Sequence, residues 1–251
     1  MDVDSHLRHL TEQANLLALA SELHGPDAPI PTCPGWVMRD LVHHQGGVHR
    51  WATHRITRPE IDPGSGDLEA FVGGWPSDES LLDWFNEGAA GIAAAIHNAP
   101  LDLEAMTFIP SPSPRHFWAR RQAMEIAVHR ADADSAGGAI APFAIDLAVD
   151  GIDELVVGFA TRPMRRYRTE TTATILVAPS DSPQSWLIRM SPEGISTTVD
   201  GAECTGADAT ISGTASDLFL FVWNRLTAAD IYAVGDPAAL ALWSQTSRVG
   251  W

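Results

Sequence analysis

Residues 114–135 read PRHFWARRQAMEIAVHRADADS, and this stretch decides how the first half of the chain folds. Apolar residues recur in it at helical spacing: Phe117, Met124 and Val128. The periodicity predicts a helix from about Pro114 to Ser135. Within it, Glu125 and His129 are four residues apart and therefore share one face. A carboxylate and an imidazole on one face can chelate a metal, although this pair also occurs by chance on many solvated helices.

Three earlier segments show the same periodicity. The first ends before Gly25, the second runs from about Val37 to Arg55, and the third contains an apolar series at alternating spacings of three and four: Leu82, Phe85, Ala89, Ile92 and Ile96. Between the second and third helices, residues 57–77 are rich in proline and glycine, which predicts a long loop. Four amphipathic helices with one long connection favour a four-helix bundle.

The pattern changes from about Gly137 onwards. A helix is expected over 146–159, and short β-branched runs predict strands at 172–177, 185–190, 195–199 and 209–212. Helices are again expected from Ser216 to Arg225 and in the segment that ends near Leu242. We therefore predict an α+β protein with a helical bundle over residues 1–139 and a smaller α+β domain over residues 140–251.

The composition excludes several classes of function. Lys and Arg number 16 and Asp and Glu 32, so the formal net charge is -16. Such a surface repels phosphate backbones and anionic lipids, so we expect neither nucleic acid nor a membrane as a partner. Cys33 and Cys204 are too few for a disulfide scaffold. The N-terminus has no apolar signal core and no long apolar run occurs, so we expect a cytoplasmic protein.

The second helix supplies a third metal ligand. It contains VHHQGGVH at 42–49, in which His44 follows Leu41 by three residues and precedes Val48 by four. This spacing places His44 in the buried stripe, at the end expected to meet the fourth helix. A hydrogen-bonded core histidine is the alternative interpretation. His43 lies about 100° from His44 and is expected to be exposed, whereas His49 lies about 140° away and is a candidate for a supporting or substrate-facing role.

His44, Glu125 and His129 would form a set of two histidines and one glutamate. Three protein ligands leave one coordination position open, which is typical of catalytic rather than structural zinc. Zinc suits these ligands best, and nickel and iron are alternatives. The open position could hold water or a thiol that loses its proton.

Three motifs lie just before or within the second helix: PTCPGW at 31–36, RDLVHH at 39–44 and GGVHRW at 46–51. They resemble the opening motif of the mycothiol-dependent maleylpyruvate isomerase family, part of the DinB/YfiT-like metal-binding superfamily, and residues 125–132 resemble its second motif. The resemblance implies a DinB-like bundle followed by a domain similar to sterol-carrier folds. It also implies the same three metal ligands, mycothiol as cosubstrate and an active-site arginine at Arg225. His43 and Gln45 depart from the usual residues of the first motif.

The sequence thus predicts a metal-dependent, mycothiol-dependent isomerase or S-transferase that acts on a small electrophile. A non-catalytic metal-binding or regulatory module and a metal-dependent hydrolase are the alternatives. Arg225 could instead serve as a helix C-terminal residue favoured by the helix dipole. Cys33, flanked by prolines, is expected to have a structural role.

Overall fold

The computed structural model describes residues 1–62, 64, 66–164, 167–200 and 206–247. The chain divides into two compact units, Met1–Ala141 and Pro142–Trp251. The first is helical and the second combines helices with a sheet, so the predicted α+β fold class is confirmed.

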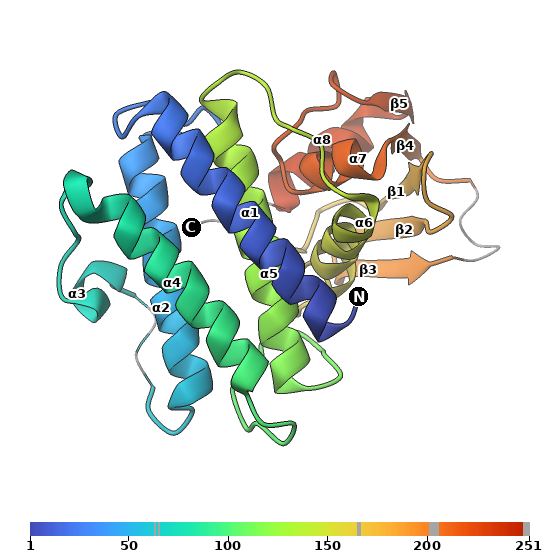
Figure 1. The fold of residues 1–251 in the computed structure, drawn as a ribbon. Coiled ribbons are helices and arrows are strands. Elements are labelled where there is room, and N and C mark those ends of the chain that lie inside the picture. Colours follow the sequence, from blue (N-terminus) through green and yellow to red (C-terminus); the bar gives the residue numbers. More distant parts are fainter. Residues whose placement is uncertain (63, 65, 165–166, 201–205, 248–251) are drawn as a thin grey trace. The chain divides into compact units, whose positions relative to one another are not determined.

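The first unit is built on four long helices: α1 (Val3–His24), α2 (Met38–Thr57), α4 (Asp78–Asn98) and α5 (Pro114–Ser135). Helix α1 packs on α4 and α5, and α2 packs on the same two helices (Figure 1). Each helix therefore contacts two others around a common core, as in the four-helix bundle that the sequence predicts.

The helix ends follow from local chemistry. The side chain of Asp2 accepts a hydrogen bond from the Ser5 amide at 2.8 Å, which caps α1. Ser113 caps α5 in the same way, with its hydroxyl 3.1 Å from the His116 amide, and Pro114 occupies the first helical turn. Helix α1 ends at Gly25, whose φ of 81° most other residues avoid. Ser113 and Pro114 thus fix where α5, the helix with two candidate ligands, begins.

Two adjacent glycines of α2 leave room for neighbouring side chains, Gly46 on the side of α4 and Gly47 on the side of residues 68–75. A Cβ on Gly46 would lie 2.1 Å from the ring of Trp84, and one on Gly47 would lie 3.3 Å from the ring of Trp75. Side chains from other elements cover α2 on several sides, so its buried residues extend beyond a single apolar stripe. His43, expected to be exposed, is buried, with its ring stacked on Trp75 at 4.9 Å and 9°. That expectation was wrong because aromatic side chains from beyond the helix cover this face.

The segment predicted as one long loop contains a short helix, α3 (Leu68–Val72). Asp67 caps it by accepting a hydrogen bond from the Ala70 amide at 2.9 Å, and Gly73 ends it in the left-handed conformation. Five residues are too few to show a helical period, so only the capping residues could have revealed this helix.

The second unit contains a five-stranded sheet in the order β3-β2-β1-β4-β5. Its strands are β1 (Ala173–Pro179), β2 (Trp186–Ser191), β3 (Gly194–Val199), β4 (Ala209–Gly213) and β5 (Tyr232–Gly235). β1 and β4 are parallel, and the other pairs are antiparallel. Helices α7 (Ala215–Val222) and α8 (Pro237–Thr246) pack on β1 and β4.

The helix expected over 146–159 changes geometry part-way. Helix α6 (Ile145–Asp153) is followed by the π-helical turn η1 (Glu154–Phe159). Two carbonyls of this segment accept side-chain hydrogen bonds, that of Gly151 from Trp223 Nε1 at 3.0 Å and that of Val156 from Thr197 Oγ1 at 2.6 Å. Such insertions compete with the normal ladder and account for the wider turn.

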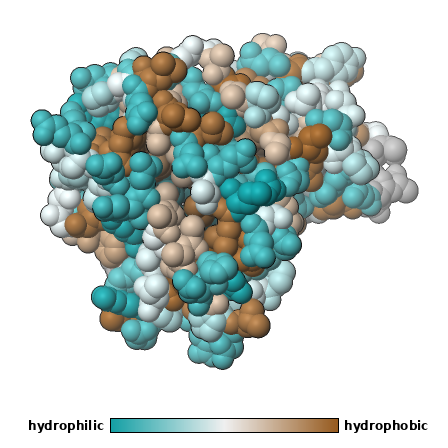
Figure 2. All heavy atoms as spheres, in the orientation of Figure 1, coloured by the Kyte–Doolittle hydropathy of each residue, from teal (hydrophilic) through white to brown (hydrophobic). Residues whose placement is uncertain are grey.

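Among the described helices, none combines the length and apolar character that crossing a bilayer requires. Figure 2 shows hydrophilic and hydrophobic residues interspersed on the visible face. The exposed leucines of α1, Leu16, Leu19 and Leu23, lie on the side of that helix away from its buried residues.

Candidate metal centre

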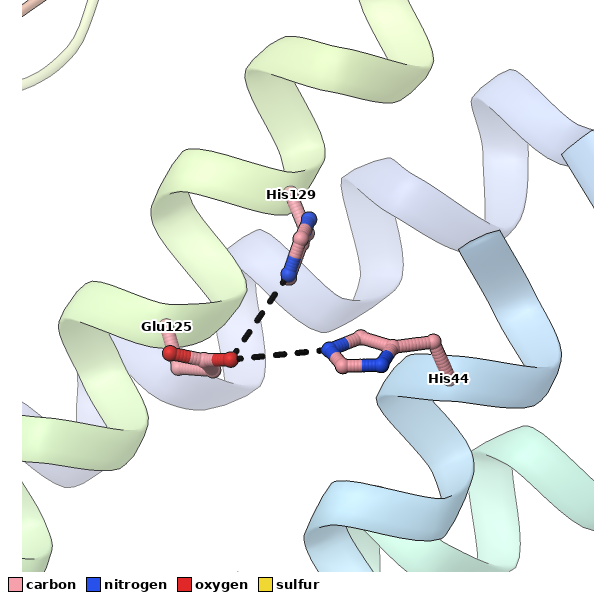
Figure 3. Close-up of side chains that lie close together, drawn as sticks. All are labelled: His44, Glu125 and His129. Carbon is pink, nitrogen blue, oxygen red and sulfur yellow. Dashed lines mark ion pairs between the residues drawn. The ribbon is translucent and has the colours of Figure 1, made fainter. Parts of the chain in front are cut away.

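The structure brings the three predicted ligands together between two helices. His44 on α2 points toward α5, where Glu125 and His129 lie one turn apart (Figure 3). Oε1 of Glu125 is 3.8 Å from Nε2 of His44 and 3.6 Å from Nε2 of His129. The three ligand atoms all lie within 4.8 Å of one another. His129 is completely buried, whereas the His44 side chain is 17% exposed, although its Nε2 atom is itself buried.

These separations fit a shared cation better than direct hydrogen bonds. Hydrogen bonds between such atoms are about 2.7–3.2 Å long, so both contacts are too long for good ones. Ligand atoms arranged tetrahedrally about 2.0–2.2 Å from one zinc ion lie roughly 3.3–3.6 Å apart, so the 3.6 Å contact matches this spacing and the 3.8 Å contact lies slightly above it. In the part of the chain that the structure describes, this is the one group of three or more His, Cys, Asp or Glu with such spacing.

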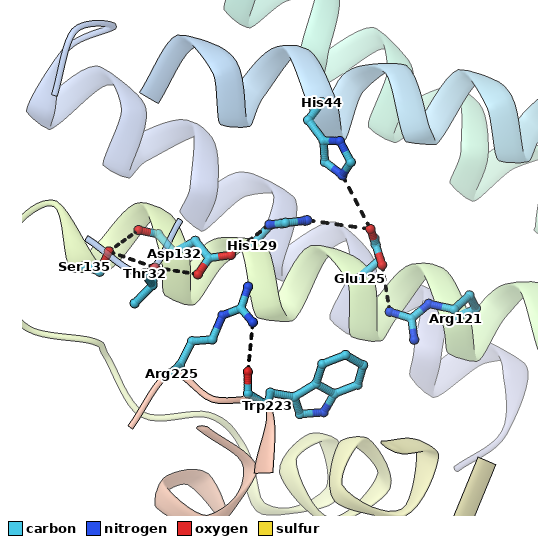
Figure 4. A network of polar contacts seen from close by, with 9 residues as sticks. All are labelled: Thr32, His44, Arg121, Glu125, His129, Asp132, Ser135, Trp223 and Arg225. Atoms are coloured by element: carbon cyan, nitrogen blue, oxygen red, sulfur yellow. Dashed lines mark hydrogen bonds and ion pairs between the residues drawn. The ribbon is translucent and has the colours of Figure 1, made fainter. Parts of the chain in front are cut away.

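A buried network orients His129. Its Nδ1 donates to Oδ2 of Asp132 at 2.9 Å, and the hydroxyl of Thr32 donates to the other carboxylate oxygen at 2.6 Å (Figure 4). The Ser135 hydroxyl lies 3.2 Å from that of Thr32. Because Nδ1 donates to a carboxylate, the neutral form of the imidazole has its lone pair on Nε2, the nitrogen on the side of Glu125. The network also ties the loop before α2 to helix α5.

Glu125 is held from its other side by Arg121. Nη2 of Arg121 donates to Oε2 of Glu125 at 2.8 Å, so the two carboxylate oxygens have different neighbours (Figure 4). Burial alone would raise the pKa of Glu125, but His129, His44 and Arg121 outweigh it and hold that pKa well below its ordinary value. Glu125 is therefore an anion, as a metal ligand must be.

The two imidazoles differ in basicity. Burial lowers the pKa of His44, and Glu125 offsets this only in part. Burial also opposes protonation of His129, but the carboxylates of Asp132 and Glu125 raise its pKa above the ordinary value. The network around His129 thus makes it the more basic of the two ligands.

Trp36 covers one side of the cluster. Its ring centroid lies 5.2 Å from that of His44 and 6.4 Å from that of His129, stacked on the latter at 19°. The indole comes from the loop before α2 and is partly exposed. It therefore shields both imidazoles from part of the solvent.

Two family models match the chain. The "Mycothiol maleylpyruvate isomerase N-terminal domain" matches residues 7–134, and the "MDMPI C-terminal domain" matches residues 146–242. The chain belongs to the mycothiol maleylpyruvate isomerase family. The family resemblance inferred from the motifs is thereby confirmed, and the three clustered side chains all lie in the part matched by the N-terminal model.

Two solved structures share the fold of this family member. The crystal structure of the mycothiol-dependent maleylpyruvate isomerase has a TM-score of 0.64 at 12% identity, and each chain is covered to 93%. A histidine-to-alanine variant of the mycothiol-dependent maleylpyruvate isomerase has a TM-score of 0.62 at 11% identity and the same coverage. No curated protein matches the sequence.

His49 lies deeper in the bundle than a substrate-facing residue. It is completely buried, its Nε2 is 2.9 Å from Nε2 of Gln45, and its ring packs against Phe85 at 5.7 Å. Burial lowers its pKa to about 3, so it is neutral at ordinary pH. Its environment favours a supporting position.

Arg225 belongs to the second unit and follows the end of α7. That helix stops at Val222, so the predicted extension to Arg225 was wrong, although the arginine still contacts the C-terminal end of the helix through the C-cap residue Trp223. Its Nη1 donates to the carbonyl of Trp223 at 2.8 Å (Figure 4). Its amide donates to the carbonyl of Leu220 at 2.7 Å. A positive φ of 60° at Asn224 turns the chain away from the helix axis.

Sequence reasoning assigned no role to Asp132, Arg121, Thr32 or Trp36. Spacing could have identified the first two, because Asp132 follows His129 by three residues and Arg121 precedes Glu125 by four. Thr32 and Trp36 come from a loop, and no periodicity indicates where a loop residue lies. Cys33 is buried, and Cys204 lies outside the described residues.

Proposed function

We propose that this chain is a metal-dependent isomerase that uses mycothiol as a thiol cosubstrate. One observation carries the proposal, the convergence of His44, Glu125 and His129 within 4.8 Å. Membership of the mycothiol maleylpyruvate isomerase family supports the choice of thiol and reaction. A cytoplasmic location without nucleic-acid or membrane partners belongs to the same proposal.

The bound ion is proposed to be zinc, because two imidazoles and one carboxylate suit zinc best, with nickel and iron as alternatives. A divalent cation in this site would lower the pKa of a thiol that reaches its open position, so that the thiolate is available at neutral pH. His44, Glu125 and His129 would hold it. Trp36 would limit the access of water, and Asp132 would keep His129 in the ligating tautomer.

The proposed reaction is addition, rotation and elimination. The thiolate of mycothiol adds to one carbon of a cis double bond conjugated to a carbonyl, and the electron pair of that bond moves to the carbonyl oxygen. The remaining single bond rotates, and return of the electron pair expels the thiolate and leaves the trans isomer. With an alkyl halide or epoxide, the same thiolate would be transferred to the substrate instead.

Two further residues have proposed roles in catalysis. Arg225 would bind a substrate carboxylate or the developing enolate oxygen, since a guanidinium is suited to both. His49, neutral and bonded to Gln45, would support the site from the bundle interior.

The test combines elemental analysis with turnover. The protein purified with zinc should contain one ion per chain, and it should isomerise a cis-enedione acid only when mycothiol is present. Glu125→Gln keeps the shape of the ligand but removes its charge, so both the ion and the turnover should be lost. Arg130→Met, on the same helix but bonded to Asp134, is a control that should retain the ion.

Turnover without thiol would favour a metal-dependent hydrolase or another reaction and contradict the proposal. Full activity of Glu125→Gln without metal would contradict it as well. A product heavier than the substrate by one mycothiol would identify S-transfer. Metal binding without any turnover would favour the non-catalytic regulatory module.

A further inference from the structure

Glu125 presents two unlike oxygens to its surroundings. Oε1 faces both imidazoles at 3.6 and 3.8 Å. Oε2 instead accepts a hydrogen bond from Nη2 of Arg121 at 2.8 Å, in a pair whose side chains are only 5% and 10% exposed. Arg121 precedes Glu125 by one helical turn, so the backbone of α5 itself sets the distance between the two groups.

A carboxylate can bind a cation through one oxygen or through both. A charge-assisted hydrogen bond from a guanidinium is among the strongest polar contacts that a buried carboxylate makes. Movement of Oε2 to within about 2.0–2.2 Å of a cation would pull this oxygen away from the position in which it accepts that bond.

We propose that Arg121 is a positioning residue that restricts Glu125 to ligation through Oε1 alone. The inference rests on the metal site proposed above. Two imidazole nitrogens and one carboxylate oxygen would then be the protein donors, which leaves one position of a four-coordinate ion for an external ligand. Without Arg121, the second oxygen of Glu125 would be able to bind as well and add a fifth donor beside the external ligand.

The same helix contains a matched pair that does not touch the ligands. Nη1 of Arg130 contacts Oδ2 of Asp134 at 2.6 Å, also at a spacing of four residues, and the side chains are 1% and 16% exposed. Asp134 also accepts from the Ala141 amide at 3.0 Å. Arg130 also donates to Oε1 of Gln13 at 2.9 Å and to the carbonyl of Ala141 at 2.6 Å, so removal of its guanidinium is a demanding control for what loss of a buried arginine does to α5.

The experiment uses the full chain loaded with Co²⁺, whose visible absorption is strong in four-coordinate sites and weak at higher coordination numbers. The wild-type protein should show the strong four-coordinate spectrum. Arg121→Met should lose most of that intensity while it still binds one Co²⁺ per chain. Arg121→Lys keeps a cationic donor near Oε2 and should retain most of the intensity, and Arg130→Met should retain all of it.

Four-coordinate intensity in Arg121→Met, equal to the wild type, would overturn the inference. So would an equal loss in Arg130→Met, which would point to general damage to the helix. If circular dichroism shows that Arg121→Met does not fold, the Co²⁺ absorption of the wild type still tests the inference. Weak absorption of the wild type would contradict ligation of the ion by a single oxygen of Glu125. A wild-type protein that binds no Co²⁺ would instead contradict the proposed function.

Discussion

Replacement of Asp132 by asparagine tests how the network behind His129 supports metal binding. The carboxylate accepts two hydrogen bonds, from His129 Nδ1 at 2.9 Å and from Thr32 Oγ1 at 2.6 Å. An amide has the same shape but only one accepting oxygen. If that oxygen stays with the Thr32 hydroxyl, the amide NH₂ faces Nδ1. The imidazole then prefers the tautomer with its proton on Nε2, which cannot bind a cation.

The expected magnitude follows from the loss of one buried, charge-assisted hydrogen bond, worth about 1.5–3 kcal/mol. Loss of an outer partner of a metal ligand typically weakens metal binding about 10- to 100-fold, which corresponds to about 1.4–2.7 kcal/mol. The two estimates agree. Asp132→Asn should therefore raise the zinc dissociation constant by one to two orders of magnitude and leave the helical content unchanged.

The assay is competition for zinc between the apo-protein and a chromophoric chelator. Asp134→Asn is the control, because Asp134 is on the same helix but bonds to Arg130 and the Ala141 amide, not to a ligand. Its zinc affinity should stay within about threefold of the wild type, well below the effect expected for loss of an outer-shell partner. Equal zinc affinity in Asp132→Asn and the wild type would refute the role of Asp132 in fixing the tautomer.

Three further outcomes are expected. Gly46→Ala should lower the free energy of unfolding in a denaturant titration, because its Cβ would meet the Trp84 ring at a cost of about 1–3 kcal/mol, offset by a helix-propensity gain of up to about 1 kcal/mol. Gly91→Ala has open space around it and should raise the free energy of unfolding in the same titration. Trp36→Ala should keep its metal by elemental analysis but lose thiol-dependent turnover as water reaches both imidazoles. Zinc at about 1,000 times its dissociation constant should stabilise the wild type by about 4 kcal/mol in chemical unfolding, and His129→Ala should not respond.

The long helices could be predicted because each combines an apolar period with a recognisable end. Ser113 and Pro114 define the start of α5, and Gly25 defines the end of α1. The structure differs from the predicted helices where side chains distant in sequence bond to the helix backbone. The π-helical turn η1 depends on side chains of Trp223 and Thr197, which no local pattern could relate to this helix.

The clustering of His44, Glu125 and His129 could be anticipated because a helix fixes which residues share a face, and the resemblance selected the same three. The surroundings of the cluster were harder to anticipate. Burial of His43 depends on Trp75, a residue in the connection that was expected to be a loop. Periodicity describes one helix at a time and gives no information on what covers it.

The charge of the whole chain is a poor guide to the charge of this site. The formal net charge of -16 argues against anionic partners in general. Around the proposed ligands, the carboxylates of Glu125 and Asp132 are negative and the guanidinium of Arg121 is positive. The raised pKa of His129 favours its protonated form, which adds at most one more positive charge. These side chains by themselves are therefore not positive overall. A divalent cation bound to neutral imidazoles would make it so, and a thiolate or carboxylate would then be attracted. Binding of an anionic substrate and occupancy by metal should thus be coupled through this change of sign.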